Sequence, residues 1–432
     1  MRLLTSEQTR SFLERAPLES YRLSPEARAR IKRAFGRSLQ PRAVVERIID
    51  GVRSRGDEAV LEFTRLLDGV EISSMEVPRK EWEKAVKALP APLLSALKIA
   101  AKRVETYHRR FRPVYPVSPE GGMGYRVRPL KRAGLYVPGG MAAYPSTVLM
   151  SAIPARVAGV EEILVVSPPQ KDGTLPAAVL ATCALAGVSR VFRVGGAQAI
   201  AALALGTKTI PRVDKICGPG GLFVQLAKKL VYGLVGIDGL YGPTEAMLLA
   251  DEGADPAAIA RELLAQAEHD PLARALLLTP SRRLARQVSQ EVERRVGELE
   301  RSQIVRQALE KGGGIVLVKG LEEGVVLVNA FAPEHVALFL EDPLPWVEKI
   351  ENAGAIFLGP EGALGDYTAG PSHVLPTGGT ARFASPLGVA DFIKLTSVVA
   401  LDERERKKLS RPAAVIARAE GLTAHARALE GD

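Results

Sequence analysis

The chain has 432 residues, of which 47% are hydrophobic and 25% charged. Such a composition is typical of a globular protein and excludes a disordered or fibrous chain. Because no apolar run reaches about 18 residues and charges interrupt the first segment, we expect no membrane span and no export signal, and therefore a cytoplasmic protein. The two cysteines are too few for a disulfide framework or a cysteine-based zinc site.

The net charge of +9 makes nucleic acid a partner to consider. The densest basic run, Ala101–Pro113, spreads its arginines around a predicted helix, and no nucleic-acid-binding motif follows it. A solvated helical face explains this run better, so we expect no nucleic-acid partner. His108, within the same helix, is interpreted as a surface residue.

The predicted elements change character along the chain. Residues 1 to about 112 read as helical, because apolar residues recur every three or four positions. The stretch "GYRVRPLKRAGLYVPGG" (124–140) predicts a strand, a turn and a second strand. Short apolar strands then alternate with helices over 162–234 and again over 242–362, and the tail from about 380 is expected to return to helix.

Apolar strands that alternate with amphipathic helices predict parallel sheets covered on both faces. We therefore expect an α/β fold with two Rossmann-like domains and small helical segments at the two ends. The expected parts are an N-terminal helical arm (1–30), a discontinuous first α/β domain (31–120 and 240–378), a second Rossmann-like domain (125–239) and a C-terminal helical tail (379–432).

Four polar clusters interrupt this pattern. Gln266 and His269 are three residues apart on a predicted helix, so they can share one target, although a capping histidine and a surface glutamine explain the pair as well. Glu334 and His335 come just before an apolar strand, at the sheet edge where α/β enzymes place their sites. They form either an acid–base couple or two solvated residues at the start of a strand.

The other two clusters lie later in the chain. Asp366 and His373 belong to a long loop rich in Gly, Pro, Ser and Thr, and loops of this length are usually functional or disordered. Glu420 and His425 lie close to the C-terminus, where a histidine matters only if the tail docks on a site. Four of the five histidines thus have an acidic or amide neighbour, a distribution typical of a catalytic zinc site.

Two glycine turns between strand and helix, 194–204 and 218–229, offer backbone amides for a pyrophosphate. Neither is a GxGxxG motif, so tight structural turns remain an equal explanation. Cys217, beside the second turn, is interpreted as a small buried residue at a strand end in preference to a nucleophile.

Taken together, the motifs resemble a known family. The chain is similar to the histidinol dehydrogenases from about residue 40 to its end, through motifs that occur in the family's order: "RAGLYVPGG", "VGGAQAIAALA", "GPGG", "GIDGLYGPTE", "LLAQAEHD", "NAFAPEH", "GDYTAGPSHVLPTGGTARF" and "EGLTAH". The resemblance implies oxidation of L-histidinol to L-histidine in two NAD-dependent steps through a bound aldehyde, with one zinc ion per subunit.

The resemblance also implies roles for individual residues. The zinc ligands would be Gln266, His269, Asp366 and His425, and the substrate would contact these four as well as Thr244, His335 and Glu420. His335 would take the alcohol proton and serve again in the second oxidation, while Glu334 would activate water to attack the aldehyde. His373 would support the site, and NAD would contact Tyr136, Gln198 and Gly221.

Two positions depart from the family pattern. Gly221 stands where many members have Asn, so that a side-chain contact to NAD is absent, and Thr244 replaces a common Ser but keeps the hydroxyl. The family is dimeric, and the C-terminal segment of one subunit completes the site of the other, which would explain a ligand as late as His425.

Other functions remain to be weighed. Related dehydrogenases of other small alcohols, such as sulfonated diols, share the zinc site and the bases, but Glu420 favours a substrate with a cationic amine. A zinc hydrolase would explain the metal but neither Tyr136, Gln198 nor the glycine turns. A nucleic-acid-binding protein would leave the four polar clusters unexplained.

Overall fold

The computed structural model describes residues 1–431 apart from residues 6, 7, 10, 11, 16, 22, 116–121 and 140–142. The chain forms two compact units, one made of Met1–Arg112 with Leu130–Phe392 and the other of Pro113–Pro129 with Ile393–Asp432. Among the described helices, none combines the length and apolar character needed to cross a membrane.

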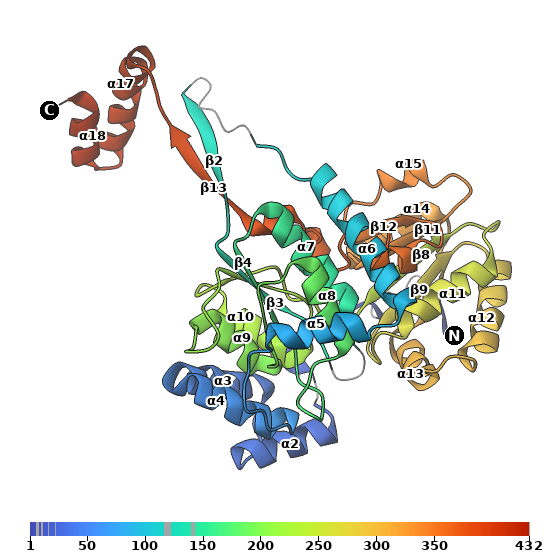
Figure 1. The fold of residues 1–432 in the computed structure, drawn as a ribbon. Coiled ribbons are helices and arrows are strands. Elements are labelled where there is room, and N and C mark those ends of the chain that lie inside the picture. The colour runs from blue at the N-terminus through green and yellow to red at the C-terminus, as the bar shows by residue number, and fades with distance from the viewer. Residues whose placement is uncertain are drawn as a thin grey trace. The chain divides into compact units, whose positions relative to one another are not determined.

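A five-stranded parallel sheet forms one half of the larger unit (Figure 1). Its strands, in the order β5-β4-β3-β6-β7, are β3 (Arg132–Tyr136), β4 (Glu162–Val166), β5 (Arg190–Phe192), β6 (Lys215–Cys217) and β7 (Gly236–Ile237). The chain starts at the centre with β3, builds outward on one side, and returns through β6 on the other. In parallel sheets, the carboxyl ends of the strands at such a change of direction, here β3 and β6, are the usual place for a ligand.

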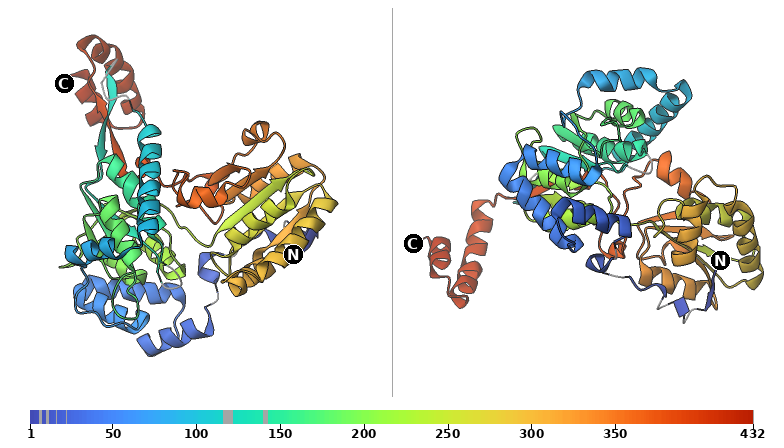
Figure 2. Two further views of the ribbon diagram at one scale, coloured as in Figure 1. Left: turned by 45° about the vertical axis from the view of Figure 1, so that its right-hand side comes forward. Right: turned by 90° about the horizontal axis from the view of Figure 1, so that it is seen from below.

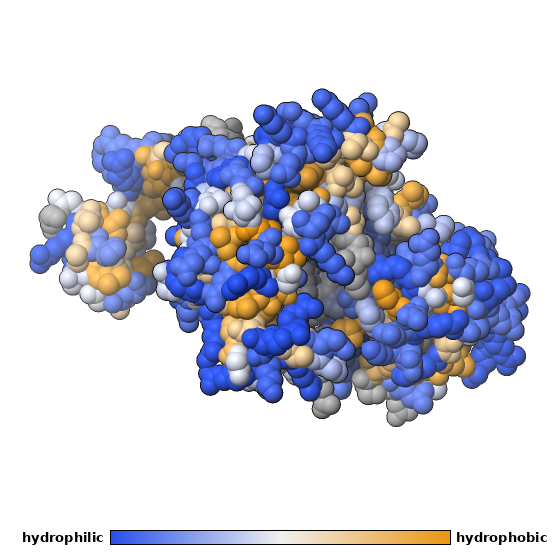
Figure 3. Space-filling view, turned by 60° about the horizontal axis from the view of Figure 1, so that its bottom comes forward, coloured by the Kyte–Doolittle hydropathy of each residue, from blue (hydrophilic) through white to orange (hydrophobic). Residues whose placement is uncertain are grey.

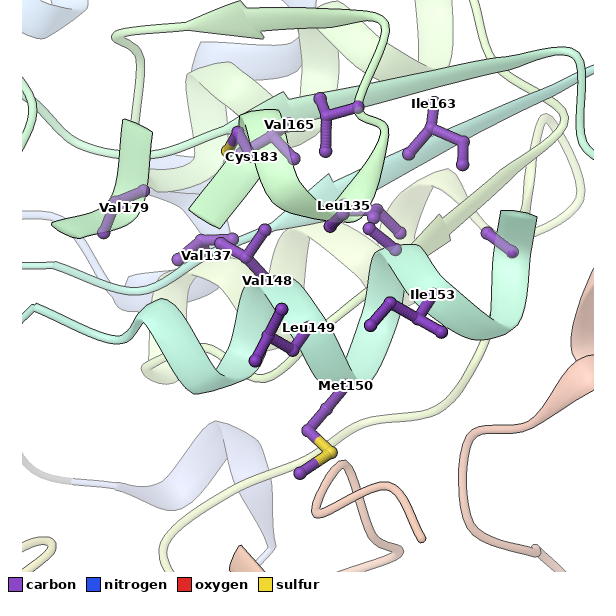
Figure 4. Packing of buried hydrophobic residues seen from close by; sticks show 14 of the residues in the cluster. Leu135, Val137, Val148, Leu149, Met150, Ile153, Ile163, Val165, Val179 and Cys183 are labelled. Atoms are coloured by element: carbon purple, nitrogen blue, oxygen red, sulfur yellow. The ribbon is translucent and has the colours of Figure 1, made fainter. Parts of the chain in front are cut away.

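Both faces of this sheet are covered, which explains why its strands are almost wholly apolar. Leu135 and Val165 face one layer of helices, and Figure 4 shows them packed against Leu149 and Ile153. That layer comprises α5 (Arg79–Ala88), α6 (Ala91–Arg110), α7 (Pro145–Ala158) and α8 (Ala177–Ala186). Leu164, one residue along, faces the other layer, which comprises α2 (Pro25–Phe35), α3 (Pro41–Arg55), α4 (Asp57–Phe63), α9 (Gly196–Leu205) and α10 (Leu222–Val231).

A six-stranded parallel sheet forms the other half of the larger unit. Its strands, in the order β1-β10-β9-β8-β11-β12, are β1 (Leu3–Thr5), β8 (Glu245–Ala250), β9 (Arg274–Thr279), β10 (Gly314–Leu317), β11 (His335–Phe339) and β12 (Ala355–Leu358). The first described strand of the chain therefore forms one edge, where Leu3 pairs with Ile315.

Alternate residues of β8 face opposite layers of this second sheet as well. Leu248 packs against the layer of α11 (Pro256–Ala267), α12 (Arg282–Val296) and α13 (Ser302–Gly312), and Figure 2 shows these helices along the sheet. Leu249 packs on the opposite face, which carries α14 (Leu321–Phe331) and the short α15 (Leu344–Val347). Two parallel sheets, each between helices, confirm the predicted α/β class with two Rossmann-like halves.

The smaller unit is built on an antiparallel pair, β2 (Met123–Pro129) with β13 (Ile393–Val399). Two helices follow, α17 (Glu403–Ala419) and α18 (Thr423–Glu430), and Ala414, Ala417 and Ala426 form the small core between them. The predicted return to helix from about 380 is therefore wrong over β13. The predicted strand, turn and second strand within 124–140 are confirmed as β2 and β3. The two strands belong to different sheets, since β2 is a half-exposed ribbon strand and β3 is buried in the parallel sheet.

Helix packing also groups the chain differently from the domains expected from the sequence. Residues 31–120 were grouped with 240–378, but the helices between Pro25 and Arg110 cover the five-stranded sheet instead. Their apolar faces match that sheet, and amphipathic periodicity alone does not say which sheet a helix will cover. Within the expected helical arm, 1–30, β1 joins the six-stranded sheet.

His108 is buried, with only 4% of its surface exposed, so its interpretation as a surface residue is wrong. It continues the face of α6 formed by Ala100 and Val104, which are spaced four residues apart and are also buried. The basic residues around it occupy the other faces of the helix. Nε2 of His108 has no hydrogen-bond partner among the described residues.

Candidate active site

The polar residues singled out in the sequence gather at the amino-terminal ends of strands in the six-stranded sheet. Glu334 directly precedes β11, His335 is its first residue, and Glu245 begins the neighbouring strand β8. Parallel sheets usually hold ligands outside the opposite, carboxyl ends of their strands. The expectation that Glu334 and His335 lie at that usual edge is therefore wrong.

Helix α11 brings two of the predicted ligands to the same edge, because it follows β8 and returns along the sheet. Its start is fixed by Asp255, whose carboxylate accepts hydrogen bonds from the amides of Ala257 and Ala258 at 2.9 and 3.2 Å. Gln266 lies buried in its last turn, and His269 follows just beyond its end.

The orientation of the Gln266 amide is set by its two neighbours. Its Nε2 donates to Oε1 of Glu262, one turn earlier, at 3.2 Å. Its Oε1 therefore faces Nδ1 of His335, at 3.0 Å, and accepts the proton on that nitrogen. Nε2 of His335 is then the basic nitrogen, and it is buried without a hydrogen-bond partner among the described residues.

Asp366, in the short helix α16 (Gly362–Tyr367), lies near both histidines. Its Oδ2 is 4.0 Å from Nε2 of His269, and its Oδ1 is 3.7 Å from Nε2 of His335. Burial, with a contribution from Glu262, raises the pKa of Asp366 to about 7. Burial also lowers the pKa of His269 and lowers that of His335 to about 3, so both rings are neutral at neutral pH.

Glu334 is buried beside this group. The backbone amide of Glu245 donates to its Oε2 at 3.2 Å. Burial raises the pKa of Glu334 well above its ordinary value, and the nearby carboxylate of Asp366 adds to the rise. The Thr244 hydroxyl acts in the opposite sense, because its hydrogen bond lowers this pKa. A carboxyl group whose proton affinity is raised in this way is suited to general acid–base chemistry.

His373 connects this cluster to the five-stranded half. Its Nδ1 donates to the backbone oxygen of Asp366 at 2.8 Å, and its Nε2 lies 3.2 Å from the hydroxyl of Thr147 in α7. Nearby, the hydroxyl of Ser372 donates to the backbone oxygen of Met150, also in α7. The supporting role of His373 remains a prediction.

The donors at this site fit a zinc ion. An amide oxygen from Gln266, a neutral imidazole from His269 and a carboxylate from Asp366 lie together, and a cation would offset the cost of burying that carboxylate. Within the described ranges, however, no three His, Cys, Asp or Glu side chains are placed to hold a metal. Gln266, His269 and Asp366 would therefore need a fourth ligand to complete a zinc site.

The two site residues predicted near the C-terminus lie in the other unit. Glu420 follows the last turn of α17, and His425 belongs to α18. Both side chains are exposed. Their roles at the zinc and the substrate remain predictions.

The three predicted cofactor residues lie at the carboxyl edge of the five-stranded sheet. Tyr136 ends β3, Gln198 is in the first turn of α9, and Gly221 precedes α10. The carboxyl ends of β3 and β6 are where sheets of this order bind nucleotides. Gly218 follows β6 with φ +113, and a Cβ there would lie 2.2 Å from the Tyr136 backbone oxygen, so that only glycine fits.

Two of these cofactor residues also form the turn before α9. The Tyr136 hydroxyl accepts a hydrogen bond from the amide of Gly196 at 3.2 Å, and Nε2 of Gln198 donates to Oδ2 of Asp68 at 2.9 Å. Oε1 of Gln198 is buried and forms no hydrogen bond within the described part of the chain.

Cys217 is buried at the end of β6, as predicted, and burial raises the pKa of its thiol well above the ordinary value. A thiol held protonated in this way is a poor nucleophile. Near it, Lys228 forms a buried ion pair with Asp238 and donates to the backbone oxygen of Gly218 at 3.0 Å. This pair fixes the second glycine turn and was not predicted.

Three further residues at the site escaped the sequence analysis: Glu245, Glu262 and Asp68. Glu262 had a local signal, because it precedes Gln266 by four residues on the same helix. Glu245 and Asp68 act on residues far away in the chain, and their surroundings in the sequence do not reveal this.

The chain is similar to known histidinol dehydrogenases over almost its whole length. The family model for histidinol dehydrogenase matches residues 32–431. A histidinol dehydrogenase from Thermus thermophilus is 51% identical over 94% of this chain and 98% of its own length. One from Dehalococcoides mccartyi is 48% identical over 96% of each chain.

Solved structures give the same result. The crystal structure of histidinol dehydrogenase from Elizabethkingia anophelis matches with a TM-score of 0.90 and 29% identity, over 100% of this chain and 97% of that one. An acetylating aldehyde dehydrogenase from Geobacillus thermoglucosidasius matches with a TM-score of 0.50 and 15% identity, over 91% of this chain and 96% of that one. The second likeness concerns the fold alone.

Proposed function

Because the chain belongs to the histidinol dehydrogenase family, an NAD-dependent group of oxidoreductases, we propose that it oxidises L-histidinol to L-histidine through L-histidinaldehyde. Two NAD⁺ would be consumed per histidinol, one zinc ion would serve each subunit, and the enzyme would work in the cytoplasm as part of histidine biosynthesis. The observation that carries this proposal is the convergence of Gln266, His269 and Asp366 beside His335.

Gln266, His269 and Asp366 would hold the zinc, and the partner subunit's His425 would supply the fourth ligand. When bound, zinc would fix the substrate through its imidazole and amino nitrogens. A neutral amide such as that of Gln266 leaves more positive charge on a metal than a carboxylate does. The same four residues, with Thr244, His335 and the partner subunit's Glu420, would surround the substrate.

His335 would act as the base in both oxidations. Its Nδ1 proton is held by Gln266, so its free Nε2 is the atom that can accept the proton of the alcohol. The carboxylate of Asp366, 3.7 Å away, would stabilise the imidazolium that results. NAD⁺ would accept the hydride in each oxidation, bound at the sheet edge where Tyr136, Gln198 and Gly221 lie.

Glu334 would act between the two oxidations. It would take a proton from water as the water oxygen bonds to the aldehyde carbon, and His335 would return its proton to the former carbonyl oxygen. The product is a gem-diol, and no electrons are transferred in this step. His335, neutral again, would then accept a proton from the gem-diol during the second hydride transfer. The raised pKa of Glu334 supports this role.

A homodimer would complete the site. The smaller unit exposes apolar side chains that its own small core does not cover, including Val415 at 63%, Ile416 at 60% and Leu422 at 46% exposure. Figure 3 shows hydrophobic side chains gathered on the C-terminal helices. Such a surface is suited to a partner subunit, and the exposed His425 and Glu420 lie on the same helices.

The experiment that tests this function measures NADH formed per molecule of limiting L-histidinol at alkaline pH, with and without a chelator. Two NADH per histidinol, lost on chelation and restored by zinc, are expected. One NADH with released aldehyde would contradict the role of Glu334. No NADH from folded, zinc-loaded dimer would point to another alcohol, such as a sulfonated diol.

A further inference from the structure

Arg15 lies in the N-terminal segment, outside the residues 32–431 that the family model matches. Its Nε and Nη2 donate to the two carboxylate oxygens of Glu245 at 2.7 and 2.8 Å. The Glu245 side chain is only 8% exposed, so this two-point pair provides most of the compensation for burying its charge. The pair links residues that are far apart in the sequence.

Glu245 in turn contacts two parts of the active site. Its backbone amide donates to the carboxylate of Glu334 at 3.2 Å. Its Oε2 accepts a hydrogen bond from the amide of Gly378 at 3.0 Å, in the loop that also carries His373. Glu245 therefore contacts the loop through its side chain and the acid–base residue Glu334 through its backbone.

Arg15 supports Glu334 from a second side. Its guanidinium lies over the ring of Phe331, 3.7 Å from the ring centre. Phe331 ends α14 three residues before Glu334. Ala332, the first of the two residues between them, has φ +50, the one positive φ outside glycine among the described residues. A non-glycine residue in this conformation persists only when its surroundings hold it.

Two more contacts fix the segment that delivers Arg15. The Arg274 guanidinium donates to the backbone oxygens of Phe12 and Glu14 at 3.1 and 2.9 Å. The backbone amide of Arg274 donates to the backbone oxygen of Thr244 at 2.8 Å. The N-terminal segment is thus bound to the residues that immediately surround Glu334.

We propose that Arg15 is a positioning residue for the second oxidation: by holding Glu245 and Phe331, it keeps the Glu334 carboxylate aimed to take the proton of water. This inference rests on the proposed function. The first oxidation, which depends on His335, does not use the Glu334 carboxylate and should be affected little.

The test compares Arg15→Gln with the parent enzyme, as full-length, zinc-loaded dimer. Stopped-flow measurement of NADH should show an unchanged first turnover and a second turnover about 10- to 100-fold slower, the loss usual when a reacting group is slightly misplaced. Histidinaldehyde should accumulate, and NADH per histidinol should approach one over the time in which the parent enzyme gives two. Arg15→Lys keeps the charge and should recover part of the second rate.

A second measurement separates positioning from general destabilisation. Millimolar guanidinium should restore the second turnover of Arg15→Ala by occupying the space between Phe331 and Glu245, whereas sodium chloride of equal ionic strength should not. Arg28→Gln, at an exposed position of α2, is the matched control and should behave as the parent enzyme does.

Three results would overturn the proposal. An unchanged second turnover in Arg15→Gln would show that Arg15 is not needed. Equal slowing of both turnovers, without rescue by guanidinium, would show a structural role only. A parent enzyme that does not oxidise histidinol would overturn the proposed function itself, and this outcome is visible before any variant is compared.

Discussion

Nδ1 of His335 lies 3.0 Å from Oε1 of Gln266, and this contact determines which nitrogen of the ring can act as a base. Gln266 can present its oxygen to the ring because its Nε2 is held by Glu262, at 3.2 Å. A buried chain of three side chains therefore fixes both an amide orientation and an imidazole tautomer. The proposed metal ligand and the proposed base are set by the same hydrogen bonds.

Replacing Glu262 by leucine should loosen this chain at its start. Without an acceptor for Nε2, the Gln266 amide is free to turn its oxygen away from the metal position. We expect the zinc dissociation constant to rise about 10- to 100-fold, as is usual when the residue that orients a ligand is lost. Titration of zinc-free protein against a competing chromogenic chelator measures this constant. Glu262→Gln keeps an acceptor oxygen and is the control; equal zinc affinity in both variants would contradict the prediction.

Sites shared between subunits predict recovery of activity in mixed dimers. A Glu334→Gln subunit paired with a His425→Ala subunit forms one site with both defects and one with neither. Random reassociation makes half of all dimers hybrid, so about a quarter of the parent activity should return. A mixture of Glu334→Gln with His335→Asn should recover nothing, since every site then keeps one defect. If the first mixture also stays inactive after proven subunit exchange, each site is complete within one chain.

We expect replacement of Gly221 by asparagine to strengthen NAD binding. The φ of Gly221, −66, suits any residue, the glycine precedes the first turn of α10, and an added Cβ would meet nothing within 4 Å. Gly221→Asn should therefore fit and should lower KM for NAD by about 2- to 10-fold, the value of one hydrogen bond, with kcat unchanged. Initial-rate kinetics with varied NAD measure this. Gly221→Ala occupies the same space without the amide; an equal effect of both substitutions would exclude a polar contact.

Because His108 is buried, we expect the free energy of unfolding to fall in acid. Burial lowers the pKa of His108 from 6.5 in the unfolded chain to about 4 in the folded protein. The unfolded state thus binds more protons between these values, so the stability is fully present above pH 6.5 and falls as the pH drops toward 4. The loss is at most on the order of 3 kcal/mol. His108→Phe should flatten the dependence of Tm on pH over this range; a variant as acid-sensitive as the parent protein would contradict the assignment.

Local patterns in the sequence predicted where helices and strands lie better than they predicted which elements pack against one another. The central strands of both parallel sheets were recognisable because strands buried on both faces are continuous apolar runs. The short edge strands β1 and β7 were not predicted. β13 was missed because most of its residues are exposed and its partner, β2, lies far away in the chain. The helices before Arg110 were predicted as helices, but their periodicity did not indicate which sheet they would cover.

The residues of the site likewise differ in whether their neighbours in the sequence reveal them. Gln266 and His269 are close in the sequence and were found together. Glu334 and Asp366 were found in clusters of their own, and the motif resemblance gave them their proposed roles. Glu245, in contrast, is identified only by its contacts with Arg15 and Glu334, both distant in the chain. The interpretation of His108 as a surface residue was wrong for a related reason. The charged residues around it lie on the exposed faces of the helix, whereas His108 lies on the buried face.

The pairing of Leu3 with Ile315 has a consequence for synthesis of the chain. On the ribosome β1 emerges well before its partner β10, which follows about 310 residues later. The five-stranded sheet, 132–237, is continuous in the sequence and can close well before that point. The amino group of Met1 finally donates to the hydroxyl of Ser289 at 3.4 Å, so even the terminus is bound to a late element. An affinity tag fused there would delay the docking of this strand, since these residues are made early but are among the last to reach their native positions.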